Sequence, residues 1–282
     1  MTPLAPPIGQ PGTPASSPEE YIIRFEDVAI GFEQPVLEGI SFQLARAETK
    51  VLLGASGTGK TLILKLALGL IKPDSGHITV LGEEVTQIRE EDLFALRRRI
   101  GMVFQEGALF DSLTVEENVA YRLLEETGQV TEEIHARVLE ALRFVELEHT
   151  VELFPSELSG GMRRRVAIAR AMITQPEVLL YDSPTGGLDP VTSNTIIELV
   201  VKQRDVYHTS SLLVSHRLQD AFTLASHYFD RQQNKMVPAV DGAARADHRT
   251  SFLILHDGKV IFEGTATDLL RCHDPYIREY LS

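Results

Sequence analysis

The chain contains the stretch Gly54-Ala55-Ser56-Gly57-Thr58-Gly59-Lys60-Thr61, which fills every fixed position of the phosphate-loop pattern G-x-x-x-x-G-K-[ST]. Residues 50–53 before it read as a short buried strand, and residues 62–70 after it keep apolar side chains at helical spacing. A loop between a strand and a helix directs its amides at an anion, and Lys60 adds a full positive charge. We therefore expect a nucleotide-phosphate site, in which the Thr61 hydroxyl faces Mg²⁺.

Composition narrows the class of protein. The 282 residues are 43% hydrophobic and 24% charged, as in ordinary globular proteins. The formal net charge of -13 argues against a nucleic-acid binder, because neutralising phosphates requires a basic surface. The most apolar run, 61–71, is short and contains Lys65, so we expect no membrane-spanning helix.

The ends of the chain carry two further expectations. Residues 1–20 are rich in proline, and the first 18 contain no Lys or Arg, which predicts a disordered tail without the charged start of a secretory signal and hence a cytosolic protein. The single cysteine, Cys272, excludes an internal disulfide. Its neighbour His273 does not make it a metal site, because no further ligands cluster there.

Hydrophobic patterning predicts an α/β fold with antiparallel additions. Residues 21–28 and 40–45 alternate like antiparallel strands around a turn at 31–34, and 77–81 reads as an edge strand. Buried strands are expected at 102–104, 178–182 and 211–215, and helices at 91–100, 131–145 and 159–173. Thr114 and Glu117 form a capping-box pattern at the start of a helical stretch that ends near residue 155.

The last sixty residues predict a loop and a hairpin. Residues 226–250 are polar and interrupted by Pro238 and Gly242, and they read as an inserted loop. Residues 252–256 and 259–263 are expected to pair across Asp257-Gly258, which is a type I′ turn signal. A short helical tail then ends the chain.

Polar residues at strand ends are the site candidates. Gln105, Asp182 and His216 each end or follow a predicted core strand, where open α/β sheets bind ligands. A carboxylate such as Asp182 can hold Mg²⁺ opposite a phosphate loop. Phe32, in the turn before the loop, is interpreted in two ways, as a packing residue or as a ring that stacks on a purine base.

Two helix starts complete the pattern. Asp189-Pro190 is typical of a helix N-cap followed by proline at the first helical position. Gly160-Gly161 opens the helix at 159–173, which carries Arg163, Arg164, Arg165 and Arg170. We interpret these arginines as a basic solvated face.

In this order the motifs resemble an ATP-binding cassette (ABC) ATPase over residues 21–282. The matching positions are Phe32, the Walker A loop Gly54 to Thr61, the Q-loop Gln105, the signature Leu158-Ser159-Gly160-Gly161-Met162, the Walker B end Asp182, the D-loop Asp189 and the switch histidine His216. The resemblance implies an ABC-type P-loop ATPase with a RecA-like core, an antiparallel β subdomain and a helical subdomain inserted at about 106–172. ATP and Mg²⁺ are the implied cofactors, and Thr61, Gln105 and Asp182 the implied metal residues.

In this family two cassettes pair head to tail, so a homodimer with shared ATP sites is implied, and Ser159, Gly160, Gly161 and Met162 of one subunit face the other's nucleotide. Met162 stands where glutamine is usual. Ser183 occupies the position of the glutamate that usually polarises the attacking water. The resemblance implies that Ser183, His216 and Gln105 are the catalytic residues. Since serine cannot accept a proton near pH 7, we expect slow hydrolysis.

At a finer level, segments 104–120 and 274–281, with the methionine signature, are similar to ATPases of the Mla/Mce lipid-transport systems. That similarity implies a subunit, peripheral on the inner face of the cell membrane, that powers a separate permease for phospholipid or another lipid. Polar amino-acid importer ATPases are the nearest alternative. Translation ABC proteins carry two cassettes and repair ATPases a long coiled coil, whereas this sequence has one phosphate loop and no heptad run.

In the same family, the surface after the Q-loop receives a helix of the permease. Leu109 and Phe110 are then either contacts of that helix or core residues.

Overall fold

The phosphate loop belongs to a six-stranded, mostly parallel sheet. The computed structural model describes residues 21–239 and 249–281, and its sheet runs in the order β12-β11-β3-β8-β7-β6. The strands are β3 (Thr49–Gly54), β6 (Ile100–Val103), β7 (Val178–Asp182), β8 (Ser210–Val214), β11 (Thr250–His256) and β12 (Lys259–Gly264). All neighbours pair in parallel except β11 and β12. The α/β fold class predicted from the sequence is confirmed.

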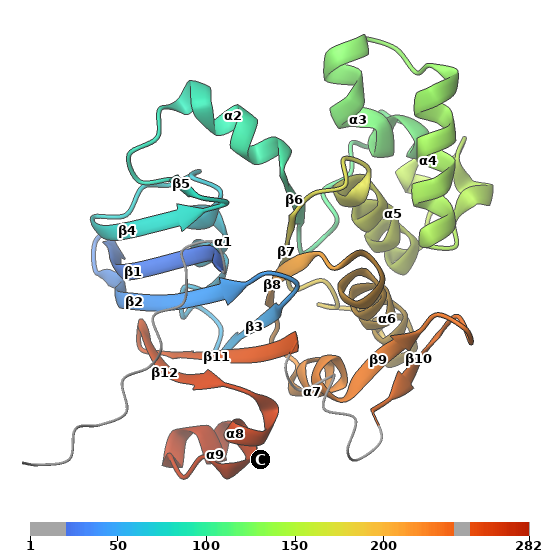
Figure 1. Ribbon diagram of the computed structural model, residues 1–282. Helices are drawn as coiled ribbons and strands as arrows, with labels where there is room; N and C mark the ends of the chain where they lie inside the picture. Colours follow the sequence, from blue (N-terminus) through green and yellow to red (C-terminus); the bar gives the residue numbers. More distant parts are fainter. Residues whose placement is uncertain (1–20, 240–248, 282) are drawn as a thin grey trace, which may run out of the picture.

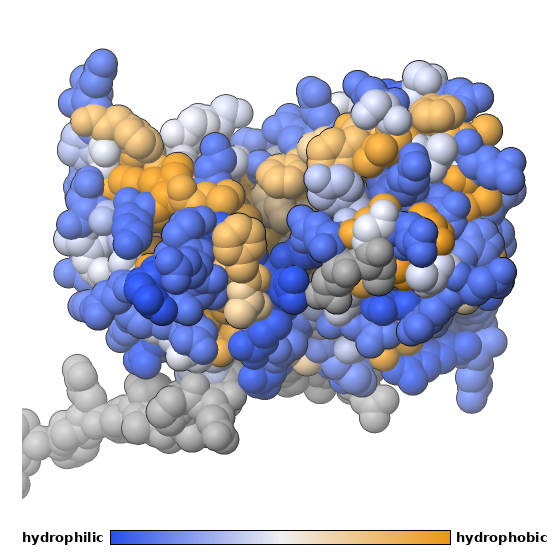
Figure 2. All heavy atoms as spheres, turned by 90° about the horizontal axis from the view of Figure 1, so that it is seen from above, coloured by the Kyte–Doolittle hydropathy of each residue, from blue (hydrophilic) through white to orange (hydrophobic). Residues whose placement is uncertain are grey.

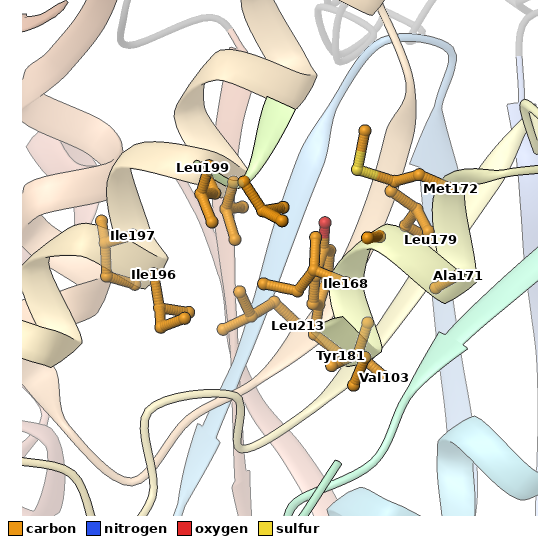
Figure 3. Close-up of a cluster of buried hydrophobic side chains, with 14 of the residues drawn as sticks. Val103, Ile168, Ala171, Met172, Leu179, Tyr181, Ile196, Ile197, Leu199 and Leu213 are labelled. Carbon is orange, nitrogen blue, oxygen red and sulfur yellow. The ribbon is translucent and has the colours of Figure 1, made fainter. Parts of the chain in front are cut away.

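Both faces of this sheet are covered. Leu213 and Tyr181 point into one apolar cluster with helices α5 (Gly160–Met172) and α6 (Pro190–Tyr207), as Figure 3 shows. Their chain neighbours Leu212 and Leu180 belong to a second cluster, which includes helix α1 (Lys60–Ala67) and the antiparallel strands. Burial on both faces explains why these strands read as continuous apolar runs.

The antiparallel sheet has the order β2-β1-β4-β5. Its strands are β1 (Tyr21–Gly31), β2 (Pro35–Ala45), β4 (Ser75–Val80) and β5 (Glu83–Glu84). The predicted pairing of the first two strands across a turn at 31–34 is confirmed, and the rings of Phe25 and Phe42 stack at 4.6 Å. The prediction that 77–81 is an edge strand is wrong, because β4 lies between β1 and the two-residue strand β5.

Helix α2 (Glu90–Arg98) precedes β6 in the chain. Helices α3 (Val115–Thr127), α4 (Glu132–Phe144) and α5 separate β6 from β7, and α3 and α4 lie beside the sheet in Figure 1. The Thr114 hydroxyl accepts from the Glu117 amide at 3.2 Å while the Glu117 carboxylate accepts from the Thr114 amide at 2.8 Å, so the capping box is confirmed. A separate helical subdomain at about 106–172 stays a prediction.

The segment 226–250 is only partly a loop. After α7 (Leu218–Ser226), strands β9 (His227–Asp230) and β10 (Lys235–Pro238) form an antiparallel hairpin, so the expected loop is corrected over these residues. The fully buried Arg204 on α6 donates to the His227 carbonyl at 2.7 Å, and the adjacent Asp205 accepts from the Phe229 amide at 2.9 Å. The core thus anchors the hairpin through backbone groups, a contact that local composition does not reveal.

The C-terminal part packs on the sheet edge. Asp257 and Gly258 both have positive φ, at 46° and 72°, which confirms the type I′ turn between β11 and β12. Helices α8 (Ala266–Arg271) and α9 (Pro275–Leu281) follow and lie beneath β11 and β12 in Figure 1. The predictions made for 1–20 and for 240–248 lie outside the described residues.

The surface alternates in polarity. Seen from above, patches of hydrophobic side chains are divided by hydrophilic ones (Figure 2). Within 21–239 and 249–281, the helices are too short or too polar for any of them to cross a bilayer.

Candidate functional site

The loop 54–61 curls through glycine conformations. Gly57 and Gly59 have φ of 82° and 91°, a region that L side chains rarely adopt. A Cβ on Gly59 would lie 2.5 Å from Leu37 Cδ2, so the loop packs tightly under β2. Gly59 is the N-cap of α1, which places the helix N-terminus at the loop.

Lys60 folds back over this loop. Its ammonium donates to the carbonyls of Gly54 at 2.9 Å and Ala55 at 2.6 Å and to Thr58 Oγ1 at 3.3 Å, and the residue is 4% exposed. Burial lowers the pKa of Lys60, and the negative charge of Asp182 partly opposes that shift. The cation is thus held where the loop encloses an anion.

Thr61 and Asp182 meet across the sheet. The Thr61 hydroxyl donates to Asp182 Oδ1 at 2.9 Å, although 121 residues separate them. Asp182 ends β7 and the loop follows β3, and both strands pair with β8, so the two strand ends face the same edge. Two hard oxygen donors beside a phosphate loop fit the ligand set of Mg²⁺, which takes one or two protein oxygens together with phosphate and water.

His216 and Phe32 line the same groove as the loop. The groove has a volume of about 390 Å³, and its lining includes Phe32, Gly57, Lys60, Thr61 and His216. Phe32 is 71% exposed, so its ring is free to contact a ligand. Burial and the charge of Lys60 lower the pKa of His216, while Asp182 and a hydrogen bond to the Gly54 backbone oppose the shift. The net shift favours the neutral form of the imidazole.

Gln105 lies beyond this groove. It follows β6 and is exposed, and a Cβ built on Gly186 would lie 3.7 Å from its Cγ. In the described part of the chain, the Gln105 side chain makes no hydrogen bond to Thr61 or Asp182. The structure thus places Gln105 beside the segment that follows β7 rather than against the other two implied metal residues.

Ser183 directly follows Asp182 and is 4% exposed. Its amide donates to the Val214 carbonyl at 3.0 Å, and its φ of 47° is unusual for a residue with a side chain. Among the described residues its hydroxyl has no hydrogen-bond partner. The Ser183 backbone is therefore held by a hydrogen bond, whereas its hydroxyl forms none among the described residues.

The signature residues start α5. Ser159 is the N-cap, and its hydroxyl accepts from the Met162 amide at 3.2 Å. A Cβ on Gly161 would lie 2.4 Å from Thr192 Cγ2, so glycine permits α5 to approach the start of α6. Ser159 and Gly160 are exposed and do not line the groove of their own chain's phosphate loop.

Asp189 caps the neighbouring helix as predicted. Its carboxylate accepts from the amides of Val191 and Thr192, both at 3.0 Å, and Pro190 is the first residue of α6. The hydrogen bonds from Thr192 and Val191 hold the pKa of Asp189 below its usual value.

The arginines of α5 do not form a solvated face, so that interpretation is wrong. Arg164 is 5% exposed and Arg170 donates to the carbonyls of Gly107 and Ala108 at 2.7 and 2.8 Å. Arg164 donates to three carbonyls, those of Phe104, Ser183 and Gly186, at 3.3, 3.5 and 3.3 Å. Arginines that the sequence predicted to be solvent-exposed therefore join α5 to the segments that carry Gln105 and Ser183.

Sequence reasoning also missed Asn118. It is fully buried in α3, and its amide donates to the carbonyls of Phe110, Leu113 and Thr114 at 3.0 to 3.1 Å. Its Oδ1 accepts from the Phe110 amide at 2.8 Å. A polar residue at a core position of a predicted helix was the available signal.

Comparison with known proteins agrees with this geometry. The family model described as ABC transporter matches residues 37–186. The chain is 33% identical over 246 residues to the intermembrane phospholipid transport system ATP-binding protein MlaF of Escherichia coli strain K12, covering 87% of this chain and 82% of that protein. It is 35% identical over 271 residues to the protein TRIGALACTOSYLDIACYLGLYCEROL 3, chloroplastic, of Arabidopsis thaliana, covering 93% of this chain and 73% of that protein.

A solved structure is similar over most of the chain. It is the dimeric post-hydrolysis state of the ATP-binding cassette MJ0796 bound to ADP and Pi, with a TM-score of 0.71 and 27% sequence identity, covering 86% of this chain and 98% of that one.

Proposed function

We propose that this chain, which belongs to the ABC transporter family of ATP-binding proteins, powers the transport of phospholipid or a related lipid through a separate membrane permease. The chain is an ABC-type ATPase. The lipid cargo is supported by the similarity to MlaF, whose name states phospholipid transport.

The observation that carries the nucleotide site is the convergence of Lys60, Thr61 and Asp182. Lys60 lies over the loop carbonyls, and the Thr61 hydroxyl meets Asp182 at 2.9 Å. Phosphoryl transfer depends mainly on positioning and electrostatic stabilisation, and this cluster supplies both signs of charge. Lys60 neutralises the β- and γ-phosphates, and the loop amides hold their oxygens.

Thr61 and Asp182 are the residues that would hold Mg²⁺, and Gln105 is the third residue that we propose for this metal site. When bound, Mg²⁺ neutralises charge on the phosphate oxygens. Phe32 stacks on the base, because its exposed ring lines the groove. His216 lines the same groove and contacts the γ-phosphate and the attacking water.

The active form is a homodimer. Ser159, Gly160 and Gly161 are exposed or half-exposed at the N-terminus of α5 and do not line their own chain's groove, so they are available to a second copy. Their amides would clamp the γ-phosphate bound to the partner's loop. The similar MJ0796 cassette was solved as a dimer with ADP and Pi. We place this dimer peripherally, on the inner face of the membrane that holds the permease.

Two measurements test these proposals. Lys60→Ala should abolish ATP hydrolysis in a chain that still folds by circular dichroism, whereas Lys72→Ala, which removes an exposed lysine beyond α1, should hydrolyse ATP at the wild-type rate. Equal hydrolysis by wild type and Lys60→Ala would refute the site.

The cargo is tested by purifying the chain with its bound membrane subunits and identifying co-purified small molecules by mass spectrometry. Enriched phospholipid supports lipid transport. Polar amino acids in its place would refute the lipid cargo without affecting the ATPase assignment.

A further inference from the structure

The C-terminal helix α9 reaches the first residue of the phosphate loop. The amide of Gly54 donates a hydrogen bond to the hydroxyl of Tyr280 at 3.2 Å, across 226 residues of sequence. Tyr280 lies in the last turn of α9, far from every motif that defines the nucleotide site in the sequence. Its hydroxyl is nevertheless in direct contact with that site.

Packing fixes where this hydroxyl lies. Ile277, one turn earlier in α9, is fully buried in the core. The ring of Tyr276 stacks on His256 at 3.7 Å and faces the ring of Tyr280 at 6.2 Å. His256 ends β11, the strand that pairs with β3 up to Leu255 and Gly54. A row of three rings therefore runs from the end of β11 to the loop.

Gly54 lies between this helix and the side chains of Lys60 and His216. The last residue pair of β3 and β8 is Leu52 with Val214, so Gly54 lies beyond that ladder and its amide bonds Tyr280. Its carbonyl accepts from Lys60 at 2.9 Å, and the His216 ring is hydrogen-bonded to its backbone. The two peptide groups that meet at Gly54 thus contact α9 through the amide and the side chains of Lys60 and His216 through the backbone on the other side.

Glycine at position 54 has more conformational freedom than other residues, and a hydrogen bond to its amide restricts that freedom. Gly54 has φ of 143°, where a side chain would collide with the Leu255 carbonyl at 2.4 Å. A glycine has more accessible conformations than any other residue, so an external partner that fixes its amide removes alternatives. Tyr280 is that partner.

We propose that Tyr280 is a positioning residue of the nucleotide site, which holds Gly54 so that its carbonyl places Lys60 and His216 for phosphate contact. This inference rests on the phosphate-loop assignment proposed above. Because coupling between two sites is reciprocal, a nucleotide on the loop also stabilises the docking of α9. The C-terminal helix is then part of the binding machinery rather than a terminal cover.

The test compares ADP affinity by calorimetry in the full-length chain. Tyr280→Phe removes only the hydroxyl and should weaken ADP binding about five- to tenfold, since it leaves the buried Gly54 amide without its partner. Tyr276→Phe is the matched control: it removes a hydroxyl from the same helix while keeping the ring on His256, and should bind ADP like wild type.

A second measurement follows the docking of α9 directly. Amide hydrogen exchange of residues 276–281 in the wild-type chain should slow when ADP is added, and this response should be lost in Tyr280→Phe. A purely structural Tyr280 would lower the unfolding midpoint when mutated but would leave ADP affinity and the ADP-dependent exchange of α9 unchanged.

The variant Lys60→Ala distinguishes a wrong assignment of the nucleotide site from a wrong role for Tyr280. If Lys60→Ala binds ADP like wild type, the nucleotide site itself is misassigned. If Lys60→Ala weakens binding while Tyr280→Phe binds normally and α9 exchange ignores ADP, the site stands and the role of Tyr280 is refuted.

Discussion

Arg164 Nη2 donates to the Gly186 carbonyl at 3.3 Å and thereby ties the signature helix α5 to the segment that follows β7. The same guanidinium reaches the Phe104 carbonyl, next to Gln105. One buried guanidinium therefore contacts three segments that carry separate sequence motifs.

Arg164→Lys should lower the free energy of unfolding by about 1.5–3 kcal/mol, because lysine cannot reproduce the fork that bonds several carbonyls. The measurement is urea unfolding followed by circular dichroism. Arg143→Lys, at an exposed site on α4, is the control and should change stability by less than about 0.5 kcal/mol. Equal stability of both variants would contradict a structural role for Arg164.

Composite sites are tested by mixing two inactive variants. Neither Lys60→Ala nor Ser159→Arg should hydrolyse ATP as a homodimer, because each homodimer lacks one half of both sites. A mixed dimer should recover up to one complete site and hence about half the wild-type activity per dimer. Full activity of Ser159→Arg alone would show that α5 does not contact the partner's nucleotide.

Thr61→Val should remove most of the effect of Mg²⁺ on ATP affinity, because it deletes the hydroxyl that meets Asp182. We expect at least about tenfold weaker binding of ATP in Mg²⁺ and little change in EDTA. Titrating a fluorescent ATP analogue under both conditions measures this. A loss of equal size in EDTA would instead indicate damage to the loop.

Ser183→Glu should hydrolyse ATP tenfold faster or more at similar ATP affinity, because it restores a carboxylate where a positioned base is expected. Steady-state rates of wild type, Ser183→Glu and His216→Ala measure this. The buried, unpartnered hydroxyl of Ser183 leaves no visible hydrogen bond to lose.

Two results would contradict the role given to Ser183. One is a Ser183→Glu rate no higher than wild type. The other is wild-type turnover already as fast as an ordinary transporter ATPase, which would mean that another group performs the glutamate's task.

Two neighbouring residues after the Q-loop, Leu109 and Phe110, should have different roles. Phe110 is 42% exposed, and its ring lies tilted against that of Tyr121 with the centroids 4.5 Å apart, whereas Leu109 is partly buried and packs against the core. Phe110→Asp should uncouple ATP hydrolysis from the permease without changing nucleotide affinity, and Leu109→Asp should lower the unfolding midpoint. Phe94→Asp, on the exposed face of α2, is the surface control. Unchanged coupling in Phe110→Asp would exclude this surface as the contact.

Local features of this protein could be read from the sequence because neighbouring residues cause them. The Thr114 capping box, the Asp257-Gly258 turn and the helix start at Asp189 depend on backbone angles and on hydrogen bonds that span three residues. Asp182 and His216 could also be assigned to the sheet edge that carries the phosphate loop, because the carboxyl ends of parallel strands lie at the same edge.

Contacts between distant segments required the tertiary structure. Arg164 looks like a surface charge in the sequence, and only the packing of α5 against the segments after β6 and β7 gives it buried carbonyls. The hairpin at 227–238 is joined to α6 by Arg204 and Asp205, which supply partners for its backbone. Tyr280 meets Gly54 because α9 docks beside β11, the neighbour of β3. The spacing of residues along the chain does not predict these contacts. They are decided by strand order and helix docking, which bring together residues that lie from 22 to 226 positions apart.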